Sequence, residues 1–158
     1  MPEEFVGGLV IRHAEARDIA ALAALFAGDA IGGHGDTTDP AVLPDYEAAF
    51  RKISQSPNDA LYVAELEGEV VGTFQTTLIT TMTARGATNL TVEAVQTRAD
   101  SRGRGIGAAM IAFAIERGRE AGVRFVQLTS SNKREAAHRF YRRLGFDQSH
   151  AGFKMTLS

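Results

Sequence analysis

RGRGIGA, residues 102–108, separates an apolar run at residues 90–97 from a helical run at residues 106–121 and decides the fold of this chain. Its glycines, Gly103, Gly105 and Gly107, leave the backbone bare where a strand is expected to turn into a helix. The first N–H groups of a helix lack intrahelical partners and lie at the positive end of its dipole, so an anion can bind against them. Arg102 and Arg104 add charge-assisted donors that suit phosphate oxygens. The stretch therefore predicts a cradle for a diphosphate.

Composition limits the other classes of function. The chain has 158 residues, of which 44% are apolar and 23% charged, and it is expected to form a single soluble domain that buries roughly 70% of its unfolded surface. Because there are no cysteines, a disulfide framework, a thiolate zinc site and a cysteine nucleophile are excluded. A net charge of −2 argues against nucleic acid as the main partner. The start lacks the features of a signal peptide, and no apolar run approaches the ~18 residues that span a bilayer. We therefore expect a cytoplasmic protein without a membrane partner.

Hydrophobic periodicity and turn residues predict the order β-α-α-β-β-β-α-β-α-β. Glu67-Gly68 predicts a hairpin turn, and Gly122 and Gly145 each predict the end of a helix. The three central strands should be antiparallel, and the unit at 89–129 should be a right-handed parallel crossover. These features predict an α+β domain with one mixed sheet and helices on both of its faces. The expected strands are 8–13, 60–65, 70–79, 89–97, 124–129 and 152–157, and the expected helices are 16–27, 43–53, 105–121 and 133–144.

Two familiar phosphate-binding loops do not fit. Residues 103–108 match G-x-G-x-x-A, but no acidic residue ends the next strand, where QLTS stands at 127–130. Four polar residues, 98–101, also separate the preceding strand from the first glycine, whereas a Rossmann turn is tight. A Walker loop is excluded because no Gly-Lys-Ser/Thr ending is present.

Residues 102–107 fit the pattern [Gln/Arg]-x-x-Gly-x-[Gly/Ala], and RFYRRLGF at 139–146 fits a late Tyr-x-x-x-Gly-Phe signature. With these two motifs, the chain resembles the GNAT N-acetyltransferase superfamily over essentially its whole length. The resemblance implies a GNAT-like fold, one N-acetyltransferase domain at 1–158, and acetyl-CoA as co-substrate. The C-terminal third is more similar to aminoalkylphosphonate N-acetyltransferases, through AHRFY at 137–141, Ser149-His150 and Phe153.

The resemblance also implies how the co-substrate is held. Backbone N–H groups of 103–108, which include Ile106 and Ala108, would hold the pyrophosphate of coenzyme A. The strand before the cradle would splay and pair with the pantetheine arm through Val95, Gln96 and Thr97. A main-chain N–H near Val95 would donate to the acetyl carbonyl as an oxyanion donor. Such a splay usually needs a β-bulge, which the sequence does not locate.

Two residues are candidates for catalysis. Tyr141 matches the family's general acid, which protonates the departing thiolate; the alternative is an aromatic on the inner face of an amphipathic helix. Glu93 is a carboxylate in a strand rich in Val and Thr, and alternation predicts that it shares one strand face with Thr91, Val95 and Thr97. Amines with pKa ~10 arrive protonated, so Glu93 could take that proton directly or through water. The alternative is a solvated or structurally ion-paired glutamate.

We expect the remaining polar candidates to have mainly structural roles. Asn132 stands where many family members place a contact to coenzyme A, but with Glu135 it also reads as a helix cap, which we favour. His34 and Asp36 lie in a loop that commonly closes over the acceptor in the family; two ligands are weak evidence for a metal, and we expect none. A run of basic residues in the last helix is expected to be a solvated face, or else a docking surface for an anion: Lys133, Arg134, Arg139, Arg142 and Arg143.

The sequence thus predicts an enzyme that transfers acetyl from acetyl-CoA to a primary amine by direct attack in a ternary complex. A small-molecule amine is favoured because of the C-terminal resemblance. The alternatives are a protein or peptide acetyltransferase and a non-catalytic acyl-CoA-binding sensor domain. Dimerisation is common in the family, so a homodimer is an expected assembly, although the sequence shows no interface.

Overall fold

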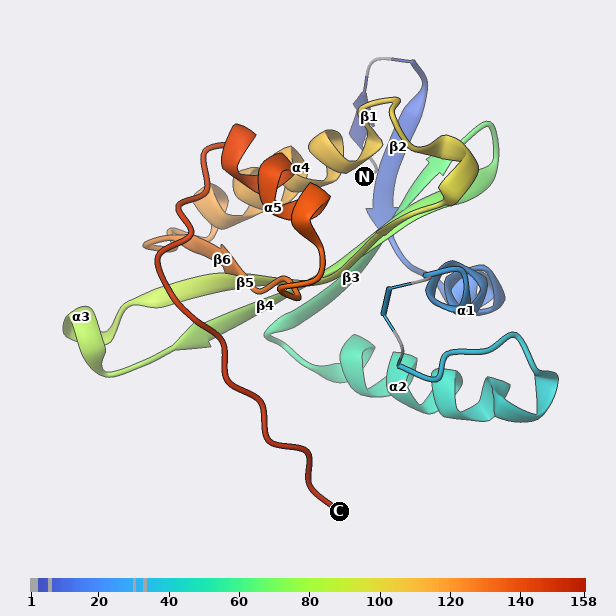
Figure 1. Ribbon diagram of the computed structural model, residues 1–158, viewed down its shortest axis with the longest axis horizontal. Helices are drawn as coiled ribbons and strands as arrows, with labels where there is room; N and C mark the ends of the chain where they lie inside the picture. Colours follow the sequence, from blue (N-terminus) through green and yellow to red (C-terminus); the bar gives the residue numbers. More distant parts are fainter. Residues whose placement is uncertain (1–2, 6, 30, 33) are drawn as a thin grey trace. The chain divides into compact units, whose positions relative to one another are not determined.

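The computed structural model of this chain describes residues 3–5, 7–29, 31–32 and 34–158 (Figure 1). The chain divides into two compact units, Met1–Leu128 and Thr129–Ser158. The first is built on a sheet with the order β1-β2-β3-β4-β5-β6, in which neighbouring strands are antiparallel except the parallel pair β5 and β6. The predicted mixed sheet is thereby confirmed. The strands are β1 Glu3–Phe5, β2 Leu9–His13, β3 Asp59–Leu66, β4 Glu69–Thr80, β5 Thr88–Thr97 and β6 Val126–Leu128.

Helices α1 and α4 pack on opposite faces of this sheet, as predicted (Figure 1). Gly72 and Thr73 are neighbours on β4, so they face opposite sides. A Cβ on Gly72 would lie 2.9 Å from Met110 Sδ of α4. On the side of Thr73, its ladder partner Gln96 bonds to Asp29, just after α1. The helices of this unit are α1 Ile19–Ala27, α2 Leu43–Gln55, α3 Thr83–Gly86 and α4 Ile106–Glu120, with 3₁₀ turns η1 Ala16–Asp18, η2 Pro40–Val42 and η3 Ala99–Ser101.

The core covers both faces of the sheet, with buried residues of α1 on one and of α4 on the other, and its aromatic cluster lies between the sheet and α4. Tyr62 and Phe74 are cross-strand partners whose rings stack at 5.0 Å, and Phe113 of α4 meets Tyr62 edge-on at 5.0 Å. Such aromatic pairs add about 0.5–1.5 kcal/mol to the burial of their area. This packing fixes α4, and therefore the loop that precedes it, against β4. The largest fully buried side chains are Phe74, Ile11, Met110, Ile111, Val63, Val71, Val92 and Thr73.

On the other face, a buried ion pair holds the start of α1 to the sheet. Arg12 of β2 donates to both oxygens of Asp18, at 2.7 and 2.9 Å, and to Glu65 of β3 at 2.9 Å. Asp18 also accepts the backbone N–H of Glu15 at 2.7 Å. The side chains of Arg12 and Asp18 are only 11% and 5% exposed, so each charge depends on its partners.

Asp18→Ala is expected to destabilise the fold by about 2 kcal/mol. The buried guanidinium of Arg12 would keep its ion pair with Glu65 but would lose the carboxylate that accepts two of its hydrogen bonds. Chemical denaturation of both proteins measures the difference. The matched control is Arg17→Ala, whose ion pair with Glu15 is exposed on both sides, and which should leave the midpoint unchanged. Equal stability of Asp18→Ala and the natural protein would contradict this role.

The same ion pair makes stability depend on pH. Burial pushes the pKa of Asp18 upward, but Arg12 and the Glu15 N–H outweigh it and hold the pKa of Asp18 below its ordinary value. A lowered folded-state pKa means that the stabilisation is present above the unfolded pKa of about 3.9 and is lost as the pH falls through the folded value. Unfolding midpoints measured from pH 6 down to pH 3 should therefore fall less in Asp18→Ala than in the natural protein.

Several element bounds differ from those predicted. The first predicted helix starts with a 3₁₀ turn, and the predicted strand at 124–129 is only the three residues of β6. Strand β1 and the one-turn helix α3 were not predicted. The hairpin turn at Glu67-Gly68 is confirmed, since both residues have positive φ, at 52° and 81°. In the described part of the chain, no helix has the length and apolar character needed to cross a membrane.

The second unit contains one helix, α5 Glu135–Arg143, which is shorter than predicted at both ends. Gly145 follows it with φ of 99°, as predicted for a glycine that ends a helix. The predicted strand at 152–157 is wrong, because this segment has no regular secondary structure. Its apolar residues Phe153, Met155 and Leu157 alternate as in a strand, yet all are at least 84% exposed.

Candidate functional site

The glycine-rich loop forms the predicted cradle at the start of α4. Gly105 is the N-cap and has φ of 80°, and Gly103 has φ of 77°, conformations that only glycine adopts without strain. The first intrahelical bond runs from the Ala109 N–H to the Gly105 carbonyl at 3.0 Å. The N–H groups of residues 106–108 therefore have no acceptor within the helix. No heavy atom lies within 4 Å of a Cβ built on Gly103 or Gly105, so the cradle is open to a ligand.

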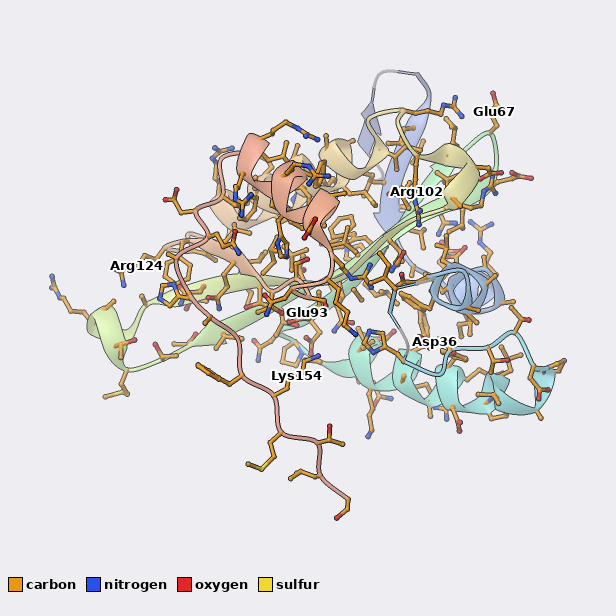
Figure 2. The ribbon with its side chains drawn as sticks, in the orientation of Figure 1. Asp36, Glu67, Glu93, Arg102, Arg124 and Lys154 are labelled. Carbon is orange, nitrogen blue, oxygen red and sulfur yellow. The ribbon has the colours of Figure 1, made fainter. Side chains whose placement is uncertain are left out.

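Both arginines of the loop are exposed beside this cradle. Arg102 donates through Nε to the Thr97 carbonyl at 3.4 Å, a long bond that holds its side chain back along the end of β5 (Figure 2). Arg104 has no hydrogen bond or ion pair to any residue that the structure describes. Four to five N–H donors on each guanidinium thus remain for an anion.

Strand β5 splays from β6 before the cradle. The parallel ladder joins residues 90–92 of β5 to residues 126–128 of β6 and ends there. Residues 93–97 continue to pair with β4 on their other side. Their edge toward β6 therefore carries backbone donors and acceptors that the sheet leaves free, and an extended ligand can pair with such an edge.

The β-bulge that the sequence could not locate lies at Ala94 and Val95. Thr73 pairs with Gln96 and Gln75 pairs with Glu93, so two residues of β5 stand opposite the single residue Phe74 of β4. Ala94 has φ of 51°, the left-handed conformation that an alanine rarely adopts. The bulge lies at the point where β5 leaves β6.

The bulge changes which side chains share a face, so the predicted grouping of Glu93 with Val95 and Thr97 is wrong. Cross-strand partners share a face, and Thr73 and Gln75 lie two residues apart on β4. Their partners Gln96 and Glu93 therefore lie on one face, the α1 side. The extra residue moves Thr97 to the α4 side, where it faces Gly72.

The bulge also sets the direction of the backbone N–H groups. The Arg98 N–H donates to the Val71 carbonyl of β4 at 2.7 Å. Since successive N–H groups of an antiparallel strand alternate in direction, the N–H group of Thr97 points away from β4, toward the free edge. This is the edge that the resemblance assigns to the pantetheine arm.

Glu93 stands next to this edge and is exposed (Figure 2). Its carboxylate makes no hydrogen bond or ion pair with the described residues, so the reading of Glu93 as a structurally ion-paired residue is not supported. Polar side chains surround it on the same face: Gln75 is its ladder partner, and Gln127 of β6 donates to Thr91 at 3.1 Å. This face can hold a polar molecule beside a free carboxylate.

The loop between α1 and α2 is joined to this face and to α2 through bonds that involve Asp29 and Tyr46, two residues that the sequence did not single out. Gln96 Nε2 donates to Asp29 Oδ2 at 2.9 Å. Farther along, the Tyr46 hydroxyl of α2 donates to Asp36 at 2.7 Å, and burial and this bond raise the pKa of Tyr46. His34 is exposed, and the described residues contain no group of three His, Cys, Asp or Glu placed to hold a metal. No local signal distinguishes Asp29 from an ordinary loop aspartate.

Two cavities adjoin α1. One, of about 270 Å³, lies at the end of β5 and includes Arg102, so it adjoins the cradle. The other, of about 210 Å³, lies between α1 and the start of α2. The larger is lined by Ala21, Ala24, Leu25, Gly28, Val70, Thr97, Arg98, Ala99 and Arg102, and the smaller by Ala20, Ala23, Thr37, Thr38, Asp39, Pro40, Leu43 and Tyr46.

Tyr141 lies on α5 in the second unit, half-buried and edge-on to Phe140 and Phe146 at 5.1 and 5.8 Å. Burial raises the pKa of Tyr141, and the positive charge of Arg134 opposes this only in part. Its hydroxyl makes no hydrogen bond to any described residue. A tyrosine of this kind stays protonated at neutral pH and keeps its O–H free to donate.

The favoured interpretation of Asn132 as a helix cap is wrong. The N-cap of α5 is Arg134, which makes no side-chain cap bond, because the helix begins two residues later than predicted. Asn132 is exposed in the turn before it. Its assignment as a contact to coenzyme A stays a prediction.

Comparisons with known proteins identify the family. The model of the "Acetyltransferase (GNAT) family" matches residues 19–146. A solved structure called a transcriptional regulator from Bacillus halodurans C-125 is 36% identical, with a TM-score of 0.90, over 94% of this chain and 99% of that one. A protein of Agrobacterium tumefaciens strain C58 described as an acetyltransferase is 27% identical, with a TM-score of 0.79, over 93% and 99%.

A third solved structure, AAC(6')-Iy bound to a bisubstrate analogue of coenzyme A and acetylneamine, is 17% identical with a TM-score of 0.75, over 95% of this chain and 98% of that one. No curated protein matches the chain significantly. The closer resemblance to aminoalkylphosphonate acetyltransferases is not confirmed and stays a prediction. The family match covers most of the chain, and the fold matches solved structures that include an acetyltransferase. The chain belongs to the acetyltransferase (GNAT) family, and it is an acyltransferase that uses acetyl-CoA as its co-substrate.

Proposed function

We propose that the chain transfers acetyl from acetyl-CoA to the primary amine of a small molecule, by direct attack of the amine in a ternary complex. One observation carries the proposal. The bulge at residues 94–95 frees a strand edge that leads directly into an open cradle of backbone N–H groups, with the unpaired carboxylate of Glu93 beside it. Edge, cradle and carboxylate belong to one continuous stretch, residues 93–108.

The donor would be held by backbone groups. The N–H groups of residues 103–108 would bind the pyrophosphate, with Arg102 and Arg104 adding charge-assisted bonds. Residues 95–97 would pair with the amide groups of the pantetheine arm as an added strand. The Val95 N–H, at the bulge, would donate to the thioester carbonyl oxygen and stabilise the negative charge that develops on it.

Proton transfers accompany both the attack of the amine and the departure of the thiolate. Glu93, directly or through a water, takes a proton from the substrate ammonium, and the free amine attacks the thioester carbon. A C–N bond forms, the C–S bond breaks, and the Tyr141 hydroxyl gives its proton to the departing thiolate. The new amide nitrogen loses its second proton through water, which returns a proton to Tyr141, and Glu93 releases its proton to solvent. The products are an N-acetyl amine and the free thiol of coenzyme A. Orientation and electrostatic stabilisation are the protein's main contributions.

A small acceptor is supported by the polar groups around Glu93. Gln75, Thr91 and Gln127 offer amide and hydroxyl groups on one face, which suits a molecule with several hydrogen-bonding groups. AAC(6')-Iy, which shares the fold, is solved with an analogue built on acetylneamine, a small amine. The aminoalkylphosphonate-like ending points to another small amine. A homodimer remains part of the proposal without an assigned interface.

Glu93→Gln is expected to lower kcat/KM about tenfold at pH 7, less than most general bases contribute, because an exposed site lets water relay the proton. The defect should shrink as the pH rises toward 10, where the amine arrives already deprotonated. Initial rates from pH 6 to pH 10 measure both effects. Gln75→Ala, on the facing strand, is the control, and its defect should not depend on pH. A Glu93→Gln defect that stays constant across this range would remove the base role.

The proposed function is tested by the release of coenzyme A thiol from acetyl-CoA across a panel of amines. The panel holds aminoalkylphosphonates, polyamines, amino sugars, aminoglycosides, amino acids and short peptides. We expect turnover with at least one small amine. Turnover with peptides alone would replace the small acceptor by a protein. A blank panel with acetyl-CoA bound would overturn the proposed transfer to a small amine.

A further inference from the structure

A row of polar side chains crosses four neighbouring strands of the sheet, from β3 to β6. In this order, the residues paired along the ladder are Asp59, Thr77, Thr91 and Gln127. Ladder partners share a face, and Thr77 lies two residues from Gln75, so the row lies on the α1 side of the sheet. Two hydrogen bonds tie the row together, from Thr77 to Asp59 and from Gln127 to Thr91. These four residues are called the polar row from here on.

The polar row lies beside the proposed base. Glu93 is two residues from Thr91 on β5, and Gln75, the ladder partner of Glu93, is two residues from Thr77 on β4. Glu93 and Asp59 therefore lie on the same face of the sheet, two strands apart. The spacing of neighbouring strands and of residues along a strand puts their Cα atoms roughly 12 Å apart. A small molecule can span the two carboxylates.

Asp59 carries a negative charge that no cation offsets. Hydrogen bonds from Thr77, Ser56 and Gln75 hold the pKa of Asp59 below its ordinary value, although partial burial opposes them. Within the described part of the chain, Asp59 forms no ion pair, whereas Glu65, near the other end of β3, is paired with Arg12. Neutral donors orient a carboxylate without cancelling its charge, and Asp59 is only half-buried. Its carboxylate can therefore bind a cation.

From this geometry we propose that Asp59 determines acceptor specificity by binding a second cationic group, so that the preferred acceptor is a diamine. The inference rests on the proposed function. The reacting amine would lie beside Glu93 and the strand edge at residues 95–97, and the far amine would form a charge-assisted hydrogen bond with Asp59. Thr77 and Thr91 lie between the two carboxylates and offer hydroxyl groups along the way. Acceptors with a neutral or an anionic far end would lack this anchor.

The separation of the two carboxylates sets the length of the acceptor. An extended diamine with roughly six to eight methylenes between its nitrogens matches the spacing of Asp59 and Glu93 on the sheet. A shorter diamine reaches only one of the two carboxylates when its reacting nitrogen is in place. A dependence of the rate on chain length is therefore expected, and it requires no altered protein to measure.

Initial rates with acetyl-CoA and unbranched diamines of two to ten methylenes test the inference. Each diamine is compared with the alkyl monoamine of the same length and with the ω-amino acid that ends in a carboxylate. In the natural protein, kcat/KM should be about tenfold higher for the diamine than for the monoamine at six to eight methylenes. The gain should lie mainly in KM, because the far amine is bound equally before and during the reaction.

Three variants isolate the charge of Asp59. Asp59→Asn keeps an oxygen that can accept from Thr77, and the ratio of diamine to monoamine should fall about tenfold. Asp59→Lys reverses the charge and should favour the ω-amino acid over the diamine of the same length. The control is Glu67→Gln, which removes an exposed carboxylate from the turn between β3 and β4, far from Glu93 (Figure 2), and which should keep the natural ratio.

The results separate this inference from the proposed function. If monoamines and diamines of every length react equally well in the natural protein, Asp59 does not select the acceptor, while the transfer to a small amine stands. A ratio in Asp59→Asn equal to that of the natural protein also overturns the inference, as does an Asp59→Lys variant that still prefers the diamine. If no amine in the series or in the wider panel releases coenzyme A, the proposed function fails and the inference fails with it. Thermal unfolding of the variants should match the natural protein within a few degrees.

Discussion

Gly105→Asp is expected to weaken acetyl-CoA binding about a thousandfold while the protein stays folded. Gly105 is the N-cap of α4, and no heavy atom lies within 4 Å of a Cβ built there, so the new side chain has room. Aspartate tolerates the left-handed conformation better than most residues and is favoured at helix N-caps. Its carboxylate would lie where the pyrophosphate is proposed to bind, and like charges placed together cost several kcal/mol.

Isothermal titration with acetyl-CoA measures this loss directly, since the chain has no tryptophan for a fluorescence assay. Gly105→Asn is the matched control, because asparagine has the same shape and the same backbone cost without the charge. It should weaken binding far less than aspartate does. Equal losses in both variants would mean that backbone strain, not charge, causes the effect, and unchanged affinity in Gly105→Asp would remove the cradle from the donor site.

The cradle could be predicted from the sequence because its physics is local. Alternating glycines between a strand and a helix permit positive φ at Gly103 and Gly105 and leave bare N–H groups, and no distant residue is needed for this argument. Most elements of the first unit were predicted for a similar reason. Their hydrophobic periodicity coincides with the face that they bury, so pattern and packing agree.

The bulge could not be predicted, because nothing in its own residues marks it. Ala94 takes a left-handed conformation without being Gly, Asn or Asp, the residues that usually signal one. The register that forces it is set by the pairing of β5 with β4 on one side and with β6 on the other. The alternation rule then failed for Glu93, since the rule assumes an uninterrupted strand.

The start of the loop between α1 and α2 and the end of the chain show two further limits of local reasoning. The bond between Asp29 and Gln96 depends on tertiary structure, and each residue alone is unremarkable in sequence. At the chain end, the alternation of Phe153, Met155 and Leu157 describes a segment that could pair, but a strand exists only where a partner edge accepts it. The cap at Asn132 failed similarly, since its pattern is compatible with a helix that starts at Glu135 instead.

Tyr141→Phe is expected to lower kcat several hundredfold with little change in the KM for acetyl-CoA. General acids typically raise reaction rates about 10²–10⁴-fold. A thiolate has a conjugate acid with a pKa of about 8.5, so it needs protonation less than an alkoxide does when it leaves. We therefore expect an effect in the lower part of this range. Phenylalanine preserves the ring contacts with Phe140 and Phe146, so the helix should be undisturbed. An interaction made only in the transition state lowers kcat and kcat/KM equally, and steady-state kinetics measure both.

The dependence of kcat on pH distinguishes an acid from a residue that only packs. Because burial raises the pKa of Tyr141 above its ordinary value of about 10, its proton stays in place through neutral and mildly alkaline pH. A general acid acts while protonated, so any loss of kcat from Tyr141 ionisation should begin at a higher pH than it would for a tyrosine of ordinary pKa. Tyr141→Phe should therefore be slower by a constant factor from pH 7 to pH 9, whereas the Glu93→Gln defect shrinks over the same range. Natural kcat in Tyr141→Phe would leave the hydroxyl without a catalytic role and would assign the departing thiolate's proton to water.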